Sequence, residues 1–188
     1  MIDSKGKLNE YLKYESEKYG RKNIRVPLIA IKERDILWKY NTILRKTEYY
    51  TNTNNTIMKI IYKIRHIRIS NKYSIHIPIN SFGKGLKLMH IGPILVNGKV
   101  RAGEDISLHI NTSIVAGGTN DNAPILGDGI VVGTGAVILG NISLASNIAI
   151  GANAVVNKSF TEENIAIAGV PAKKISNNGS IEWRKIKK

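Results

Sequence analysis

The chain has 188 residues, 43% of them hydrophobic, which is enough for one folded domain with an appendage. It contains no cysteine, so a disulfide framework, a thiolate zinc site and a cysteine nucleophile are excluded. The net charge is +14, with 17 Lys/Arg against 7 Asp/Glu in residues 1–75 and no Lys or Arg in residues 102–157. Such an excess either attracts anionic partners or only aids solubility. Because no nucleic-acid motif is recognisable, we expect no nucleic-acid partner.

Residues 1–73 are predicted to form a helical cap. A loosely helical stretch covers residues 3–19, and Pro27 interrupts it. Apolar residues then recur between residues 36 and 44 at the spacing of an amphipathic helix. After a turn at residues 51–55, a third helix carries an isoleucine stripe with basic residues on its other side. That stripe comprises Ile57, Ile60, Ile61, Ile64 and Ile67.

Neither a signal peptide nor a membrane span is predicted. The N-terminus lacks an apolar stretch, and no run approaches the roughly 18 apolar residues that cross a bilayer. We therefore expect a cytoplasmic protein.

Between Leu126 and Val156 an aliphatic residue recurs at every sixth position, and a second aliphatic series runs beside it, offset by four. A period of six fits neither a helix nor a simple strand. It indicates a chain that turns a corner every six residues and points one aliphatic side chain inward from each flat side. Three sides close a coil of about eighteen residues, so residues 74–175 are predicted to form a parallel β-helix. The two series are Leu126, Val132, Ile138, Leu144, Ile150, Val156 and Ile130, Ala136, Ile142, Ile148, Ala154.

The repeat fails between Ala116 and Ala123, where Asn120 takes a position due for an aliphatic residue. An interruption of a solenoid is usually a loop pushed out of one face, often the binding face, although an inert turn is the alternative. After the last coil, residues 176–188 are predicted to form a basic C-terminal tail.

Without cysteine, a histidine is the natural general base near neutral pH. Among the four histidines, His66 is predicted to be a surface residue and His76 a structural one. His90 lies at a coil corner beside Gly and Pro, so its side chain should point sideways from the prism. His109 follows about one coil later, and adjacent coils lie about 4.8 Å apart. The last two could share one cleft, although His109 alone also fits a packed or exposed solenoid position.

Five segments of the solenoid carry a family resemblance: Phe82-Gly83-Lys84-Gly85-Leu86-Lys87-Leu88-Met89-His90, Ala116-Gly117-Gly118, Pro124-Ile125-Leu126-Gly127-Asp128-Gly129, Gly133-Thr134-Gly135-Ala136-Val137-Ile138-Leu139-Gly140-Asn141 and Ala168-Gly169-Val170-Pro171-Ala172-Lys173. From residue 77 to 175 the chain resembles the left-handed β-helix of hexapeptide-repeat acyltransferases, and more closely the serine acetyltransferases. It is similar to the serine-acetyltransferase-like proteins associated with surface-polysaccharide synthesis.

The resemblance implies an acetyl-CoA-dependent O-acetyltransferase that needs no metal. His90 would take the proton from an acceptor hydroxyl, which attacks the thioester without an acyl-enzyme, and His109 is the second catalytic candidate. Loop backbone N–H groups could stabilise the oxyanion, because Gly permits close backbone approach. Small residues could line a groove for the pantetheine arm, and two lysines could meet the CoA phosphates. The candidate cofactor-binding residues are Ala116, Gly117, Gly118, Thr134, Ala136, Ala152, Ala154, Lys173 and Lys174.

Solenoids expose sheet faces and coil ends that need cover. Three solenoids packed with cyclic symmetry would cover these faces and build three identical clefts. We therefore expect a homotrimer or a dimer of trimers.

The chain departs from the serine acetyltransferases at three sites in the sequence and in the lengths of the loop and the cap. Met89 replaces an Asp that helps to hold the serine amine, and Ile75 replaces the Asp that orients the catalytic His. Asn122-Ala123 replaces an Arg-His pair, the loop is shorter, and the cap is about half the usual length. A desolvated free amino acid needs partners for its amine and its carboxylate. We therefore expect weak activity on free L-serine and better activity on a neutral hydroxyl such as that of a sugar.

Two further classes stay open. A γ-class carbonic anhydrase has a similar fold but needs three histidines around zinc, and only His90 and His109 are well placed. A non-catalytic scaffold that binds anionic partners through the cap would bind no acetyl-CoA.

Overall fold

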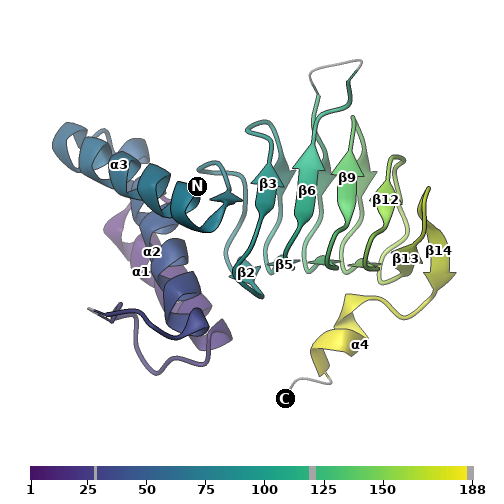
Figure 1. Ribbon diagram of the computed structural model, residues 1–188, viewed down its shortest axis with the longest axis horizontal. Coiled ribbons are helices and arrows are strands. Elements are labelled where there is room, and N and C mark those ends of the chain that lie inside the picture. Colours follow the sequence, from purple (N-terminus) through teal and green to yellow (C-terminus); the bar gives the residue numbers. More distant parts are fainter. Residues whose placement is uncertain (28, 119–121, 186–188) are drawn as a thin grey trace.

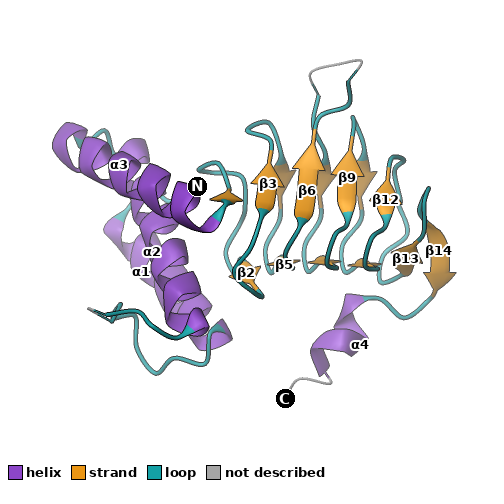
Figure 2. Cartoon of the chain, in the orientation of Figure 1, coloured by secondary structure: helices purple, strands orange, loops and turns teal. Residues whose placement is uncertain are grey.

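The computed structural model describes residues 1–27, 29–118 and 122–185. A cap of helices lies at one end of a prism of stacked coils, and a short C-terminal helix lies beside the prism (Figure 1). Helices and strands thus occupy separate parts of the molecule (Figure 2). The helices are α1 (Lys5–Lys18), α2 (Glu33–Asn52), α3 (Thr56–Tyr73) and α4 (Ser180–Lys185).

The prism has three faces, each a sheet of short strands. The first face contains β1 (Ile75–His76), β3 (Ile94–Val96), β6 (Thr112–Val115), β9 (Val137–Leu139) and β12 (Val155–Val156). The second contains β4 (Arg101–Ala102), β7 (Ile125–Leu126) and β10 (Ser143–Leu144). The third contains β2 (Lys87–Leu88), β5 (Ser107–Leu108), β8 (Val131–Val132), β11 (Ala149–Ile150), β13 (Ala166–Ala168) and β14 (Lys173–Ser176).

Successive coils stack in parallel register, as the six-residue period predicts. Val155 pairs with Val137, which lies one coil earlier in the sequence. Ser113 pairs with the same Val137 across a longer stretch of chain, because the interrupting loop leaves the prism after β6. Asn120, the residue that breaks the aliphatic series, lies outside the described residues. The fold is a left-handed β-helix of hexapeptide repeats with an N-terminal helical region.

The interior of the prism is built from the two predicted aliphatic series. All eleven of their side chains are buried, with exposed fractions of 0–7%. At one corner of three successive coils, Asn111, Gly135 and Asn153 have positive φ angles of 59°, 73° and 55°. Glycine and asparagine adopt this left-handed conformation more readily than other residues. The sharp corners therefore account for the Gly and Asn that interrupt the aliphatic repeat.

A buried ionic cluster joins the cap to the first coil. The guanidinium of Arg45 on α2 contacts the carboxylates of Glu15 at 2.7 Å and Glu48 at 3.0 Å. It also donates hydrogen bonds to the carbonyl oxygens of Phe82 at 3.0 Å and Gly83 at 2.6 Å, which belong to the first coil. This cluster fixes where α2 lies relative to the prism.

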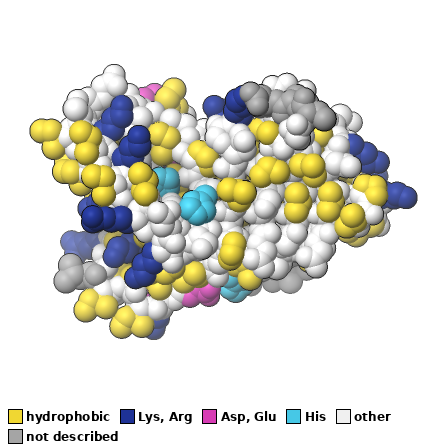
Figure 3. All heavy atoms as spheres, turned by 45° about the horizontal axis from the view of Figure 1, so that its top comes forward, with side chains coloured by type: hydrophobic (Ala, Val, Ile, Leu, Met, Phe, Trp, Pro, Cys, Tyr) yellow, Lys and Arg dark blue, Asp and Glu magenta, His cyan; other side chains and the backbone are white. Residues whose placement is uncertain are grey.

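The isoleucine stripe of α3 faces outward, which differs from the usual orientation of an apolar stripe. Ile57, Ile60, Ile61, Ile64 and Ile67 are 42–73% exposed. The buried side of α3 instead carries Tyr62, Ile69 and Ser70. Hydrophobic and basic side chains consequently alternate over the surface of the cap (Figure 3). Within the part of the chain that the structure describes, none of the helices combines the length and apolar character that a bilayer crossing demands.

Candidate functional site

His90 and His109 meet at one edge of the prism. His90 lies in the corner between β2 and β3, and His109 lies in the corresponding corner of the next coil, between β5 and β6. Their ring centroids are 6.2 Å apart, with an angle of 49° between the ring planes. Ile75 pairs with Ile94, and Ile94 with Thr112, so the coil that carries His90 is one residue longer than the next. The proximity that the spacing predicts is thus present within one chain.

A carboxylate from the cap faces His90. Glu33, the first residue of α2, places Oε2 3.4 Å from His90 Nδ1. Its other oxygen, Oε1, accepts a hydrogen bond from the Ile91 N–H at 2.9 Å, which holds the carboxylate at the corner. A carboxylate beside Nδ1 favours the tautomer that carries its proton there and leaves Nε2 free to accept one. The separation of 3.4 Å between these two atoms is long for a hydrogen bond.

Sequence reasoning missed Glu33. An acidic residue in the first turn of a helix is ordinary, because it interacts favourably with the helix dipole. Only the packing of α2 on the first coil brings Glu33 to His90, which lies 57 residues later. Ile75 is fully buried in β1, so that position supplies no polar group to the corner.

Charged residues also line a cavity of 330 Å³ beside the corner. The prism contributes Lys87 and Met89, and the cap contributes Lys18, Glu33 and Arg34. Lys18 is paired with Asp105 on the prism. The expectation of weak activity on free L-serine rests on the uncharged residues Met89 and Asn122-Ala123, which replace charged residues of the serine acetyltransferases. The cap supplies both signs of charge from another direction.

The predicted donor-binding residues Thr134 and Ala152 lie on the same edge of the prism, in the two coils that follow His109. Thr134 is half-buried and Ala152 is exposed. The neighbouring Gly133 and Gly151 are closely packed: an added Cβ would lie 2.7 Å from the Ile150 carbonyl oxygen and 2.8 Å from the Ala168 Cβ, respectively. Below the two histidines the edge is therefore formed by small residues.

Two predicted groove residues are wrong. Ala136 and Ala154 are 0% exposed and point into the prism. Both belong to the inward aliphatic series, and a side chain that fills the core cannot line a groove between subunits.

The two predicted phosphate-binding lysines lie at the far end of the stack. Lys173 and Lys174 are exposed on β14, which pairs with β13 of the last coil. Lys174 Nζ contacts Glu162 Oε1 at 2.5 Å, so an anionic ligand would compete with this pair. Thr134 and Ala152 lie at the corner that also carries His90, and Lys173 follows the same corner in the last coil. Four coil spacings of about 4.8 Å separate this last corner from His90.

The loop of Ala116, Gly117 and Gly118 lies elsewhere on the chain. It follows β6, whereas His109 precedes this strand, and four extended residues span about 13 Å. The loop projects from the end of the β6 arrow in Figure 1. Within one chain, these candidate oxyanion donors therefore do not meet the histidine pair.

The other two histidines differ in environment. The sequence predicts a surface position for His66, but its side chain is half-buried. Its Nε2 lies 3.4 Å from the Tyr40 hydroxyl oxygen. Burial, with a smaller contribution from His76, lowers the pKa of His66 to about 4. His76 is exposed on β1. Across the described residues, no three His, Asp or Glu side chains are placed to hold a metal ion, so the carbonic anhydrase alternative lacks a ligand set there.

The curated proteins to which the chain is similar include several bacterial serine acetyltransferases. The serine acetyltransferase of Buchnera aphidicola subsp. Acyrthosiphon pisum is 33% identical over 169 residues, which cover 86% of this chain and 58% of that protein. The chain thus spans little more than half the length of this relative. No family model matches the chain.

Solved structures share the fold. The Brucella abortus serine acetyltransferase has a TM-score of 0.74 at 23% identity, covering 94% of this chain and 72% of that one. The Neisseria gonorrhoeae serine acetyltransferase in complex with serine has a TM-score of 0.69 at 25% identity, covering 92% and 71%.

The stacked coils and the helical cap share the fold of a solved hexapeptide-repeat transferase from Brucella melitensis. In sequence, the chain is similar to the serine acetyltransferases. The relatives give no support to the resemblance to the surface-polysaccharide branch.

Proposed function

We propose that this chain is an acetyl-CoA-dependent O-acetyltransferase with His90 as its general base. The observation that carries the proposal is the exposed His90 with a carboxylate at Nδ1, next to His109 and to a cavity of acceptor size. Its relation to the serine acetyltransferases supports the same reaction.

In the proposed reaction, the acceptor hydroxyl gives its proton to Nε2 of His90. The oxygen attacks the carbonyl carbon of the acetyl thioester, so that a C–O bond forms and the C–S bond breaks. The proton then passes from His90 to the departing CoA sulfur. Glu33 stabilises the transient imidazolium, and no covalent acyl-enzyme forms.

The donor is proposed to lie along the edge of the prism. The acetyl group would sit at His90 and His109, and the pantetheine arm would pass Thr134 and Ala152. The CoA phosphates would reach Lys173 at the far end. The small residues of this edge leave room for an extended chain, and Lys173 offers a cation to a phosphate.

The acceptor is proposed to be a small hydroxyl compound that carries charge, with L-serine as the first candidate. Glu33 can meet an amine, and Arg34 can bind a carboxylate, as such a compound requires when it is desolvated. One feature favours a neutral sugar hydroxyl instead. Met89 lines the cavity at the position where the serine acetyltransferases carry an Asp, so the corner itself has no carboxylate at this position.

A homotrimer is proposed to complete the site. The Gly117–Gly118 loop lies too far from His90 in its own chain to act on the same substrate. A neighbouring subunit around a threefold axis could bring its loop to the corner. Sedimentation should show a trimer or a multiple of it, and a fully active monomer would exclude this arrangement.

The function is tested by release of free CoA from acetyl-CoA, measured with L-serine and with a panel of nucleotide sugars. We expect acceptor-dependent release, with L-serine giving a kcat/KM of at least about 10⁴ M⁻¹s⁻¹, the lower end of common enzyme values. Preference for a nucleotide sugar would keep the acetyltransfer and replace the acceptor. Absence of acetyl-CoA binding would instead favour the non-catalytic scaffold.

The charged acceptor is tested separately with Arg34→Gln. We expect the KM for L-serine to rise about tenfold, the usual size of a lost charge-assisted hydrogen bond, without a change in the KM for acetyl-CoA. Lys13→Gln, an equal change of charge on the exposed side of α1, is the matched control.

A further inference from the structure

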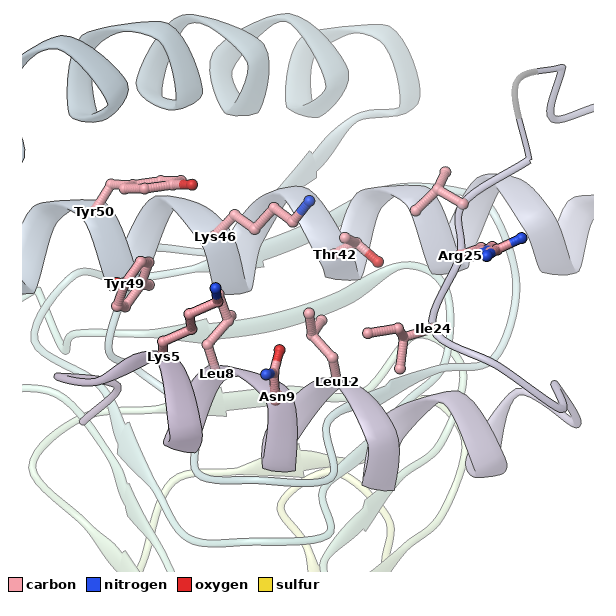
Figure 4. Close-up of a pocket in the computed structure, with 11 residues that line it drawn as sticks. Lys5, Leu8, Asn9, Leu12, Ile24, Arg25, Thr42, Lys46, Tyr49 and Tyr50 are labelled. Atoms are coloured by element: carbon pink, nitrogen blue, oxygen red, sulfur yellow. The ribbon is translucent and has the colours of Figure 1, made fainter.

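A large cavity lies within the cap, away from the histidine corner. It has a volume of 760 Å³, which is within the range of pockets that bind small molecules. Helices α1 and α2 form its two long walls, and the segment around Arg25 closes one end (Figure 4). No histidine lines it, and acetyl transfer as proposed above does not use it.

The charges around this cavity all have one sign. Lys5, Arg25 and Lys46 line it, and no Asp or Glu does. Within the described residues, none of these three cations forms an ion pair, although Lys46 lies 5.7 Å from the centroid of the Tyr62 ring. Three cations around one space repel one another, and an anion between them would relieve that repulsion.

A second, independent feature points to a ligand. The hydroxyl oxygen of Thr42 is buried, lines the cavity and makes no hydrogen bond in the described part of the chain. Thr42 is 4% exposed, and its oxygen points into the space between the helices (Figure 4). Thr47 on the same helix donates its hydroxyl to the Ile43 carbonyl oxygen at 2.7 Å, as helical threonines often do. An unpaired buried hydroxyl costs stability unless a ligand satisfies it.

The remaining walls are apolar and aromatic. Leu8 and Leu12 rise from α1 into the gap, Ile24 lies at one end, and Tyr49 and Tyr50 lie at the other (Figure 4). Such walls bind the uncharged part of a ligand, and tyrosine rings can stack on a planar group. The cavity therefore combines cations, one hydroxyl and an apolar surface.

We propose that this cavity is a binding site for a small organic anion that carries a phosphate or carboxylate group on an apolar or ring-shaped body. The acidic group lies between Lys5 and Lys46 and accepts a hydrogen bond from Thr42, and the body packs on Leu8, Leu12 and the tyrosines. This site is separate from the acetyltransferase site, so it stands or falls independently of the proposed function.

The test uses the full chain without acetyl-CoA and two probes, phenyl phosphate and benzoate, in calorimetric titrations at fixed ionic strength. Inorganic phosphate serves as a probe that has the charge but not the apolar body. We expect phenyl phosphate or benzoate to bind at least tenfold more tightly than inorganic phosphate. Methyl NMR signals of Leu8, Leu12 and Ile24 should shift during the titration.

Three variants locate the binding. Lys46→Gln should weaken the preferred probe about tenfold, and Thr42→Val about fivefold, because each removes one polar contact. Lys13→Gln removes one positive charge from the exposed side of α1 and should leave the affinity unchanged. Thr42→Val also removes an unpaired buried hydroxyl, so the fold should survive, which circular dichroism can check.

Three results would overturn the proposal. The first is no binding of either organic probe at concentrations up to about 10 mM, a range that covers weak ligands. The second is equal losses in Lys46→Gln and Lys13→Gln, which would mean that net charge alone attracts the probes. The third is methyl shifts confined to residues outside the cavity.

Discussion

Arg45 Nη2 lies 2.7 Å from Glu15 Oε1, and both side chains are completely buried between the cap and the prism. The same Glu15 oxygen accepts hydrogen bonds from the N–H groups of Gly85 at 3.0 Å and Leu86 at 3.2 Å. Burial disfavours the charged guanidinium, but the carboxylates of Glu15 and Glu48 outweigh it and raise the pKa of Arg45 above its ordinary value. This buried ion pair thus links the cap directly to the backbone of the first coil.

Replacing Arg45 with methionine should destabilise the protein by about 3–5 kcal/mol, because two buried carboxylates lose their cation. Urea unfolding followed by circular dichroism measures the loss. Arg68→Met on the exposed face of α3 is the control and should change stability by less than about 0.5 kcal/mol. A similar small effect for both variants would show that the cluster contributes little.

His90→Ala should lower turnover by roughly 10²–10⁴-fold, which is the usual contribution of a general base. The side chain is exposed, so the fold and the assembly should be unaffected. Steady-state CoA release gives the rate, and sedimentation confirms the assembly. Nearly normal turnover would refute the assignment of the base.

His109→Ala should produce a smaller loss of turnover in the same assay. The His109 ring lies beside His90 but is half-buried, and the carboxylate of Glu33 lies at His90. An unchanged rate would mark His109 as a structural residue.

Glu33→Gln tests whether this carboxylate positions His90. We expect kcat to fall about tenfold, as losses of groups that orient a functional histidine do, with little change in the KM for acetyl-CoA. Glutamine can still accept the hydrogen bond from the Ile91 N–H, so the corner should keep its shape. Glu17→Gln on the exposed side of α1 is the control. The KM for L-serine should rise as well, because Glu33 is also proposed to meet the amine. An unchanged kcat would exclude a positioning role of Glu33 at His90.

Stability should fall as the pH drops below about 6.5, partly because of His66. Its folded pKa is lowered to about 4, so in this range the unfolded chain binds a proton that the folded chain does not. The contribution is intact above about pH 6.5 and is lost progressively as the pH falls toward 4. Between pH 7 and pH 5, His66→Gln should lose about 2 kcal/mol less stability than the parent chain in urea unfolding. Parallel pH profiles would contradict this.

The six-residue period is sufficient to predict the prism, because a repeat constrains every coil in the same way. The same period predicts that Ala136 and Ala154 are buried, because both belong to the inward series. Residues of an inward series cannot line a surface groove. Likewise, a separation of about one coil between two corner histidines predicts their proximity, which the ring contact confirms.

Contacts between the cap and the prism could not be predicted in this way. Glu33 reaches His90, and Arg45 reaches the first coil, through the packing of helices that no repeat constrains. Nor does a helical stripe reveal which side of α3 packs against α2, because Tyr62 and Ile69 offer a second apolar side. These positions depend on tertiary structure, and the charged cavity next to Met89 depends on it as well.

The last strand of the prism, β14, runs antiparallel to β13, whereas the other strand pairs among the described residues are parallel. A parallel strand at the end of a stack offers its free edge to another strand running in the same direction, which is how a solenoid could lengthen into a fibre. The reversal ends that template, and two exposed lysines on β14 place like charges at the boundary. At the opposite end, α3 packs against β1. On this face the end of the stack is therefore closed, and a chain shortened before Lys173 should be more prone to end-to-end aggregation.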